Sequence, residues 1–185
     1  MQVRKSVLAG YSAERMFDLI EAAEHYPAFL PWCSGATIVE RDDAIVAADI
    51  TVDYHGVRFQ FRTRNPKRRP EWMSIRLEHG PFRHFEGEWN LQPLGADGCR
   101  IGFDLGYDFR STMMSKLAGP VFDRIANTLV DAFVARADIV YRAVTPVAFE
   151  PPAATPPLAA PATEAPADTQ SRAIPGADPN RSELS

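Results

Sequence analysis

The chain has 185 residues, of which 45% are hydrophobic and 24% charged, the composition of an ordinary globular protein. Its net charge of −4 argues against a chain that is basic throughout and binds nucleic acid. No apolar run approaches the ~20 residues that a membrane span needs, and residues 1–5 (MQVRK) resemble neither a secretory signal nor a mitochondrial transit peptide. We therefore expect a cytoplasmic protein.

Residues 143–185 differ in composition from the rest of the chain. They hold nine of the 16 prolines, with Ala, Thr and Ser between them. Such a segment cannot bury enough apolar area to offset its ordering entropy. We predict a folded domain over residues 1–142 and a Pro/Ala-rich disordered tail over 143–185, with a partner-binding arm as the alternative for the tail. The tail holds five acidic and two basic residues, so the folded part carries −1 and needs a local patch to meet an anionic partner.

The first predicted elements are a strand over residues 3–8 and a helix over 13–23, with Ser12 as the N-cap. Residues 26–33 (YPAFLPWC) then combine three aromatic rings with two prolines. Because proline fixes φ and lacks an N–H donor, this segment is predicted to be an irregular, stiff connection. An apolar connection folds back onto the core, covers a cavity, or faces a lipid or partner.

A hairpin is the best-defined unit of the sequence. A two-residue turn at His55-Gly56 pairs Asp49 with Arg62 and Val52 with Phe59, so opposite charges meet on one face and apolar groups on the other. The register is well determined, because a one-residue slip would bury the arginines. Period-two alternation predicts further strands over residues 37–41, 72–77, 82–91 and 99–109.

The last predicted element is a long amphipathic helix that begins near Pro120, with residues 111–117 as a separate turn or two kinked away by Gly119-Pro120. The order of elements predicts an α+β fold in which a curved, seven-stranded antiparallel sheet wraps around this helix and leaves an apolar cavity. The apolar stripe of the helix contains Phe122, Ile125, Ala126, Leu129, Phe133, Ala137, Val140 and Tyr141.

The amino-acid sequence resembles the START-like, helix-grip superfamily, and within it the coenzyme-Q-binding and RatA branch. The resemblance covers residues 1–142 and implies the helix-grip fold with its apolar cavity. It implies one of two functions: binding of ubiquinone in support of respiration, or the action of a toxin that blocks association of ribosomal subunits. The matching residues are 11–14, 26–33, 80–82, Trp89, Phe122, 132–133, 136–137 and 140–141.

The inward aromatic residues either pack a solid core or surround a long apolar ligand. We predict the second, with ubiquinone as the ligand, no other cofactor, and residues 26–32 as the gate of the cavity. Tyr26, Trp32 and Trp89 would each offer a hydrogen-bond donor to the quinone ring. The predicted ligand-binding residues are Tyr26, Pro27, Phe29, Leu30, Trp32, Phe59, Phe61, Phe85, Trp89, Phe103, Phe122, Leu129 and Phe133.

A basic cluster around a predicted Asn65-Pro66 turn is either a solvated hairpin tip or a contact for anionic phospholipids or ribosomal RNA. Its members are Arg62, Arg64, Lys67, Arg68 and Arg69.

No histidine or cysteine spacing suits a metal, and no catalytic set is evident, so we predict a non-enzymatic protein with two reduced, buried cysteines. The leading hypothesis is a ubiquinone carrier or chaperone at the inner face of a bacterial cytoplasmic membrane. The alternative is a RatA-type toxin that binds the large ribosomal subunit and blocks subunit association.

Overall fold

In the computed structural model, which describes residues 1–142, seven strands form one antiparallel sheet. The predicted disordered tail lies outside the described residues. The strands are β1 (Gln2–Ala9), β2 (Cys33–Arg41), β3 (Ile45–Tyr54), β4 (Val57–Arg68), β5 (Trp72–His79), β6 (Phe82–Pro93) and β7 (Cys99–Phe109). The helices are α1 (Ala13–Glu21), the short 3₁₀ helix η1 (Ala23–Ala28) and α2 (Thr112–Arg142).

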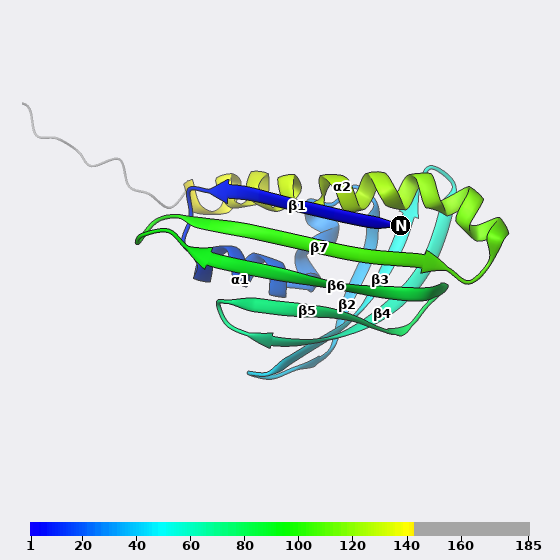
Figure 1. The fold of residues 1–185 in the computed structure, drawn as a ribbon, viewed down its shortest axis with the longest axis horizontal. Coiled ribbons are helices and arrows are strands. Elements are labelled where there is room, and N and C mark those ends of the chain that lie inside the picture. Colours follow the sequence, from blue (N-terminus) through cyan, green and yellow to red (C-terminus); the bar gives the residue numbers. More distant parts are fainter. Residues whose placement is uncertain (143–185) are drawn as a thin grey trace, which may run out of the picture. The chain divides into compact units, whose positions relative to one another are not determined.

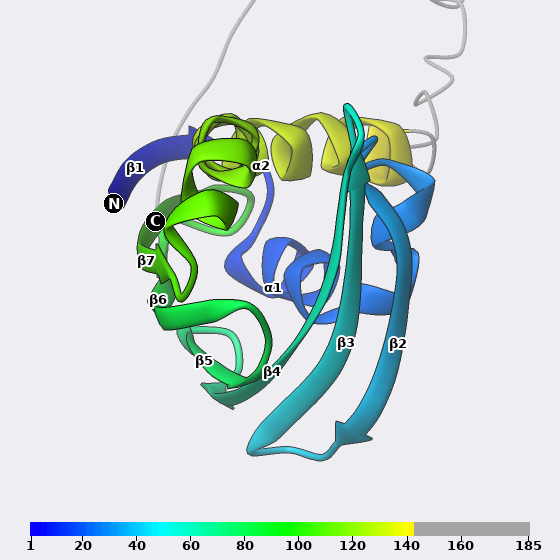
Figure 2. The same cartoon turned by 90° about the vertical axis from the view of Figure 1, so that its right-hand side faces the viewer.

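The sheet has the strand order β1-β7-β6-β5-β4-β3-β2 and curves strongly (Figure 1). Viewed from its end, it forms a trough with α2 across the open side and α1 inside (Figure 2). The predicted α+β architecture, a curved sheet of seven antiparallel strands wrapped around a long C-terminal helix, is therefore confirmed. Within residues 1–142, neither helix combines the length and apolar character that crossing a membrane would require.

The β3–β4 hairpin has the predicted register. Asp49 pairs with Arg62 and Val52 with Phe59 across the two strands. The turn residues His55 and Gly56 have φ angles of 51° and 79°, the left-handed conformation that two-residue hairpin turns use to match strand twist. This register directs one side of the hairpin toward the core.

The N-terminal elements differ from the prediction in their ends. Ser12 caps α1 as expected, since its hydroxyl accepts a hydrogen bond from the Arg15 N–H at 3.4 Å. The helix ends at Glu21, two residues earlier than predicted. The segment 26–33 is less irregular than predicted, because its first residues continue η1, in which the ring of Pro27 is accommodated.

Helix α2 is one continuous helix of 31 residues, so the predicted separation of residues 111–117 is wrong. Pro120 lies inside the helix and leaves the carbonyl of Lys116 without its usual N–H partner. The buried residues Ala118 and Phe122 on either side of it anchor the helix to the sheet. Tertiary packing thus outweighs the local cost of the proline.

An aromatic cluster fills the part of the core beneath the first half of α2. Phe122, which is 3% exposed, lies at the centre of this cluster, with ring centroids 4.7 Å from Tyr107 and 5.2 Å from Phe82. The tilted and edge-on arrangements are those that aromatic rings prefer. The other rings of the cluster are Phe59, Phe61, Phe85 and Phe109.

We expect Phe122→Ala to lower the free energy of unfolding by about 3–5 kcal/mol, because it removes a buried ring and leaves a cavity among neighbours that cannot all collapse. Urea denaturation followed by circular dichroism measures this. On the same helix, Leu117→Ala is the control: Leu117 is 62% exposed, so the change should stay within about 0.5 kcal/mol. Equal losses in both variants would contradict this account of the core.

Candidate ligand-binding cavity

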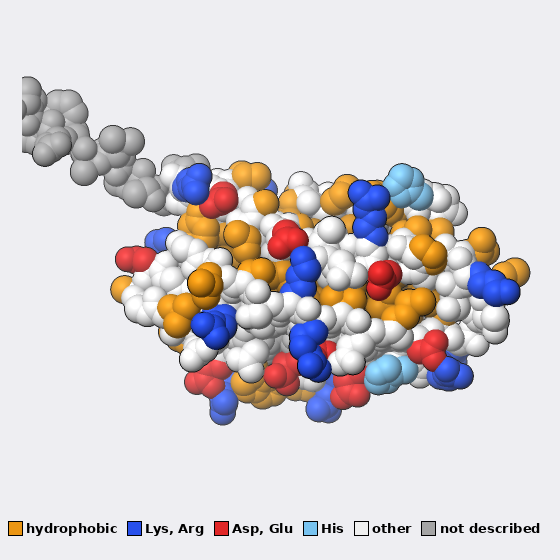
Figure 3. Space-filling model, turned by 45° about the horizontal axis from the view of Figure 1, so that its top comes forward, with side chains coloured by type: hydrophobic (Ala, Val, Ile, Leu, Met, Phe, Trp, Pro, Cys, Tyr) orange, Lys and Arg blue, Asp and Glu red, His pale blue; other side chains and the backbone are white. Residues whose placement is uncertain are grey.

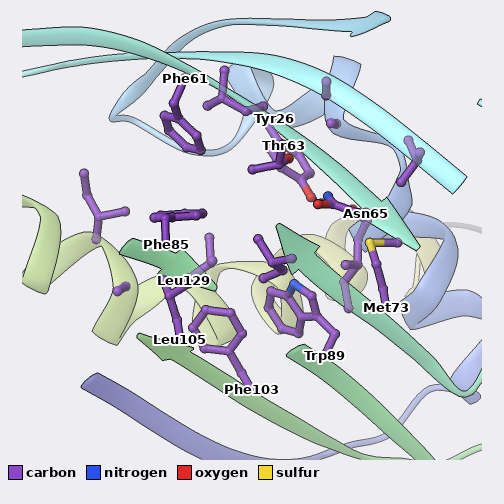
Figure 4. Close-up of a pocket in the computed structure, with 18 of the residues that line it drawn as sticks. Tyr26, Phe61, Thr63, Asn65, Met73, Phe85, Trp89, Phe103, Leu105 and Leu129 are labelled. Carbon is purple, nitrogen blue, oxygen red and sulfur yellow. The ribbon is translucent and has the colours of Figure 1, made fainter. Parts of the chain in front are cut away.

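An apolar cavity lies between the inner face of the sheet, α1 and the middle of α2. It offers about 100 Å³ to a water-sized sphere. Figure 4 shows Phe85, Trp89 and Phe103 along one side and Tyr26 on the opposite side. The core is thus not completely packed, and it leaves room for a small apolar group.

Eight of the thirteen predicted ligand-binding residues surround this cavity. They come from η1, the residues before β2, strands β4, β6 and β7, and α2, which are far apart in the sequence. Their ability to bind a ligand stays a prediction. These eight residues are Tyr26, Trp32, Phe61, Phe85, Trp89, Phe103, Phe122 and Leu129.

The other five predicted residues do not line the cavity. Pro27 is exposed, and Leu30 is buried on the far side of the segment before β2. Phe29 and Phe133 pack against each other, with ring centroids 5.3 Å apart. Phe59 belongs to the aromatic cluster beneath α2. Phe29, Phe59 and Phe133 thus pack against other rings in this structure, and a role for them in ligand binding stays a prediction.

The sequence analysis missed the polar wall of the cavity. Thr63 and Asn65 follow Phe61 on β4 and continue its inward alternation (Figure 4). The Asn65 side-chain oxygen also accepts the Arg76 N–H at 3.3 Å, where Pro66 interrupts the pairing of β4 with β5. Strict period-two counting beyond Phe61 would have identified both residues. The predicted turn at Asn65-Pro66 ended the alternation at Arg62 instead.

Lys67 continues the same inward alternation, which corrects its predicted place in a surface cluster. Its side chain is only 5% exposed, and its ammonium nitrogen lies 3.0 Å from a carboxylate oxygen of Glu21, which lines the cavity. Arg41 approaches the same oxygen at 3.7 Å and forms two hydrogen bonds with Glu24. The Arg41 guanidinium holds the pKa of Glu24 below its usual range. A network of ion pairs thus borders one end of the cavity.

The other four predicted basic residues are outward-facing but paired. The chain does not turn at Asn65-Pro66, as predicted; β4 continues to Arg68 and the turn follows it, because Asn65 and Pro66 pair with the start of β3. On the face in Figure 3, basic and acidic side chains lie interspersed. Each of the four lies 2.7–2.8 Å from a carboxylate oxygen: Arg62 from Asp49, Arg64 from Glu40, Arg68 from Glu71 and Arg69 from Asp18. Their contact with an anionic surface stays a prediction.

Two ionisable groups near the cavity are held in their neutral forms. The Tyr26 hydroxyl donates a hydrogen bond to the Ile20 carbonyl at 2.5 Å, and burial raises its pKa. Burial raises the pKa of the Cys33 thiol to about 11. A thiol that stays protonated at neutral pH is a poor nucleophile. The surroundings of the cavity therefore suit binding of an apolar group better than nucleophilic chemistry.

Comparison with known proteins identifies relatives that span this domain. The family described as "Polyketide cyclase / dehydrase and lipid transport" matches residues 9–134. The ribosome association toxin RatA of Pseudomonas aeruginosa is 36% identical over 139 residues, which cover 75% of this chain and 96% of the toxin. The mitochondrial coenzyme Q-binding protein COQ10 homolog B of Xenopus laevis is 25% identical, over 80% of this chain and 63% of that protein. The structure of a START superfamily protein from Mycobacterium smegmatis superimposes with a TM-score of 0.59 at 24% identity, over 75% of this chain and 97% of that one.

The helix-grip fold and its apolar cavity define a START-like protein. The chain belongs to the polyketide cyclase / dehydrase and lipid transport family, and within it to the group that contains RatA. The resemblance noted in the sequence is therefore confirmed.

We expect Glu21→Gln to lower the free energy of unfolding by about 3 kcal/mol, because it leaves the buried Lys67 ammonium without its counter-charge. Glu24→Gln is the matched control: it also removes a partner of Arg41, but at a more exposed position, and should cost less than about 1 kcal/mol. Thermal or urea denaturation distinguishes the two. If both variants lower the free energy of unfolding by similar amounts, the Glu21–Lys67 pair does not stabilise the fold more than an exposed ion pair does.

Proposed function

We propose that the protein acts as a RatA-type toxin that binds the large ribosomal subunit and blocks association of the subunits. The observation that carries this proposal is the 36% identity to a ribosome association toxin over 96% of its length. The aligned 139 residues are about the size of the domain described here, so the chain spans nearly everything that this relative contains. The comparisons support this hypothesis better than the quinone hypothesis that the sequence placed first.

The charges on the surface are compatible with an RNA partner despite their pairing. Arg68 is the most exposed of the basic cluster, with 67% of its side chain accessible, and Glu71 is its carboxylate partner. Exposed ion pairs are weak, so an RNA phosphate can replace the carboxylate with little loss. Arg69 suits this role less well, because its two hydrogen bonds to Asp18 join the turn after β4 to α1.

Overexpression of the full chain in a bacterial host should shift sucrose-gradient profiles from joined ribosomes toward free subunits. Arg68→Glu should weaken the shift, because it places a negative charge where an RNA phosphate would bind. Arg58→Glu is the control at the opposite end of β4: Arg58 is also exposed and faces one carboxylate, that of Asp53. Unchanged profiles with the unmodified chain would contradict the proposed function. If Arg68→Glu and Arg58→Glu change the profiles equally, Arg68 has no specific role in ribosome binding.

A second candidate function, binding of an isoprenoid quinone, is favoured by the apolar cavity and by the similarity to a coenzyme Q-binding protein. The size of the cavity limits this hypothesis. Ligand pockets commonly measure about 300–1,000 Å³, whereas this one offers about 100 Å³. A quinone with a long tail would enter only if the structure opened.

Organic extraction of the purified protein, followed by mass spectrometry, tests quinone binding. If the hypothesis holds, a quinone is recovered, and added quinone quenches the fluorescence of Trp89, which lines the cavity. Trp89→Phe should then reduce the quenching, while Trp72→Phe, outside the cavity, should preserve it. Extraction without any isoprenoid, together with fluorescence that quinone leaves unchanged, would count against this function.

A further inference from the structure

An open groove of about 380 Å³ lies on the surface, outside the cavity. We call it the outer groove. One side is formed by Pro31, Trp32 and Tyr54, from the segment before β2 and the β3–β4 hairpin. The other side is α2, with Ile125, Ala132 and Ala135. Figure 2 shows the end of this hairpin beside α2. The alanines keep the groove open, because they offer little side chain to fill it.

The outer groove and the inner cavity share part of their walls. Trp32 and Ile125 line both spaces. The Trp32 carbonyl accepts a hydrogen bond from the Asp53 N–H at 2.9 Å, which fixes the backbone at this point. Rotation of the indole about its side-chain bonds can therefore open a passage without unfolding the sheet edge. The outer groove alone lies within the roughly 300–1,000 Å³ typical of ligand pockets, whereas the inner cavity does not.

Of the two charged residues that line the outer groove, one is paired with an opposite charge and the other is not. Asp131 is paired with Lys5, with 2.9 Å between the ammonium nitrogen and a carboxylate oxygen. Arg124 also lines the groove and is exposed, and within residues 1–142 no carboxylate lies at ion-pair distance from it. The groove thus presents one uncompensated positive charge beside an apolar surface. An apolar molecule that carries one negative charge complements both features.

We propose that the outer groove and the inner cavity form one binding site for an aliphatic molecule with a single anionic group. The anionic group pairs with Arg124, and the aliphatic chain passes between Trp32 and Ile125, which follows Arg124 on α2, into the cavity. This proposal rests on the part of the second candidate function that assigns an apolar ligand to the cavity, and it replaces the neutral quinone by a molecule with one negative charge that enters past Trp32.

Calorimetric titration of the full chain with dodecanoate and dodecanol, both below the concentration at which they aggregate, tests the anionic group. Dodecanoate should bind about fivefold more tightly, the effect of one partly exposed ion pair. Arg124→Gln should abolish this preference and leave dodecanol binding unchanged. Arg100→Gln, an exposed arginine on β7 outside both spaces, should preserve it.

The outcomes separate this proposal from the function on which it rests. If the acid and the alcohol bind equally, or if Arg124→Gln keeps the preference, the anionic site is refuted while apolar binding stands. If neither compound binds, this proposal is refuted, and quinone binding is decided by the extraction experiment.

The path past the indole has its own test. Trp32→Ala should speed the association of dodecanol in stopped-flow measurements, and Trp72→Ala should not. An unchanged rate in Trp32→Ala would refute passage at this point.

Discussion

The packing of α2 into the curved sheet determines the rest of this structure. Phe122 brings rings from β4, β6 and β7 into one cluster and fixes the helix across the open side of the trough. Farther along the helix, alanines alternate with larger inward residues such as Leu129 and Phe133. Ala126 borders the cavity and Ala132 the outer groove. The same helix therefore contributes both to the packed aromatic cluster and to the walls of the unfilled spaces.

The distribution of charge follows from the same geometry. Alternation along β4 places its arginines on the outside, where carboxylates of neighbouring strands neutralise them, and places Lys67 inside, where Glu21 does so. A ribosomal partner would therefore exchange existing ion pairs for new ones instead of meeting a free positive patch. Binding through exchanged ion pairs is reversible, and it weakens as the salt concentration rises.

The sequence predicted the fold well where local patterns and tertiary packing agree. The β3–β4 register followed from Asp49 and Arg62, since a one-residue slip would bury the arginines. The prediction failed at Pro120, because a local signal for a break was outweighed by contacts from distant strands. It also failed at Lys67, which was assigned to a surface cluster, and at Asn65, which was assigned to a turn, although the alternation along β4 places both inside. The size of the cavity was beyond prediction, because it depends on how side chains from distant elements fit together.

Trp32 lines two compartments, the inner cavity and the outer groove. A ring that forms one wall of both cannot move toward one without enlarging the other. The occupancies of the two compartments are therefore thermodynamically linked, and the linkage is reciprocal: whatever free energy a guest in one contributes to the position of the indole is felt equally by a guest in the other. A single side chain is sufficient for this communication, without any rearrangement of the sheet.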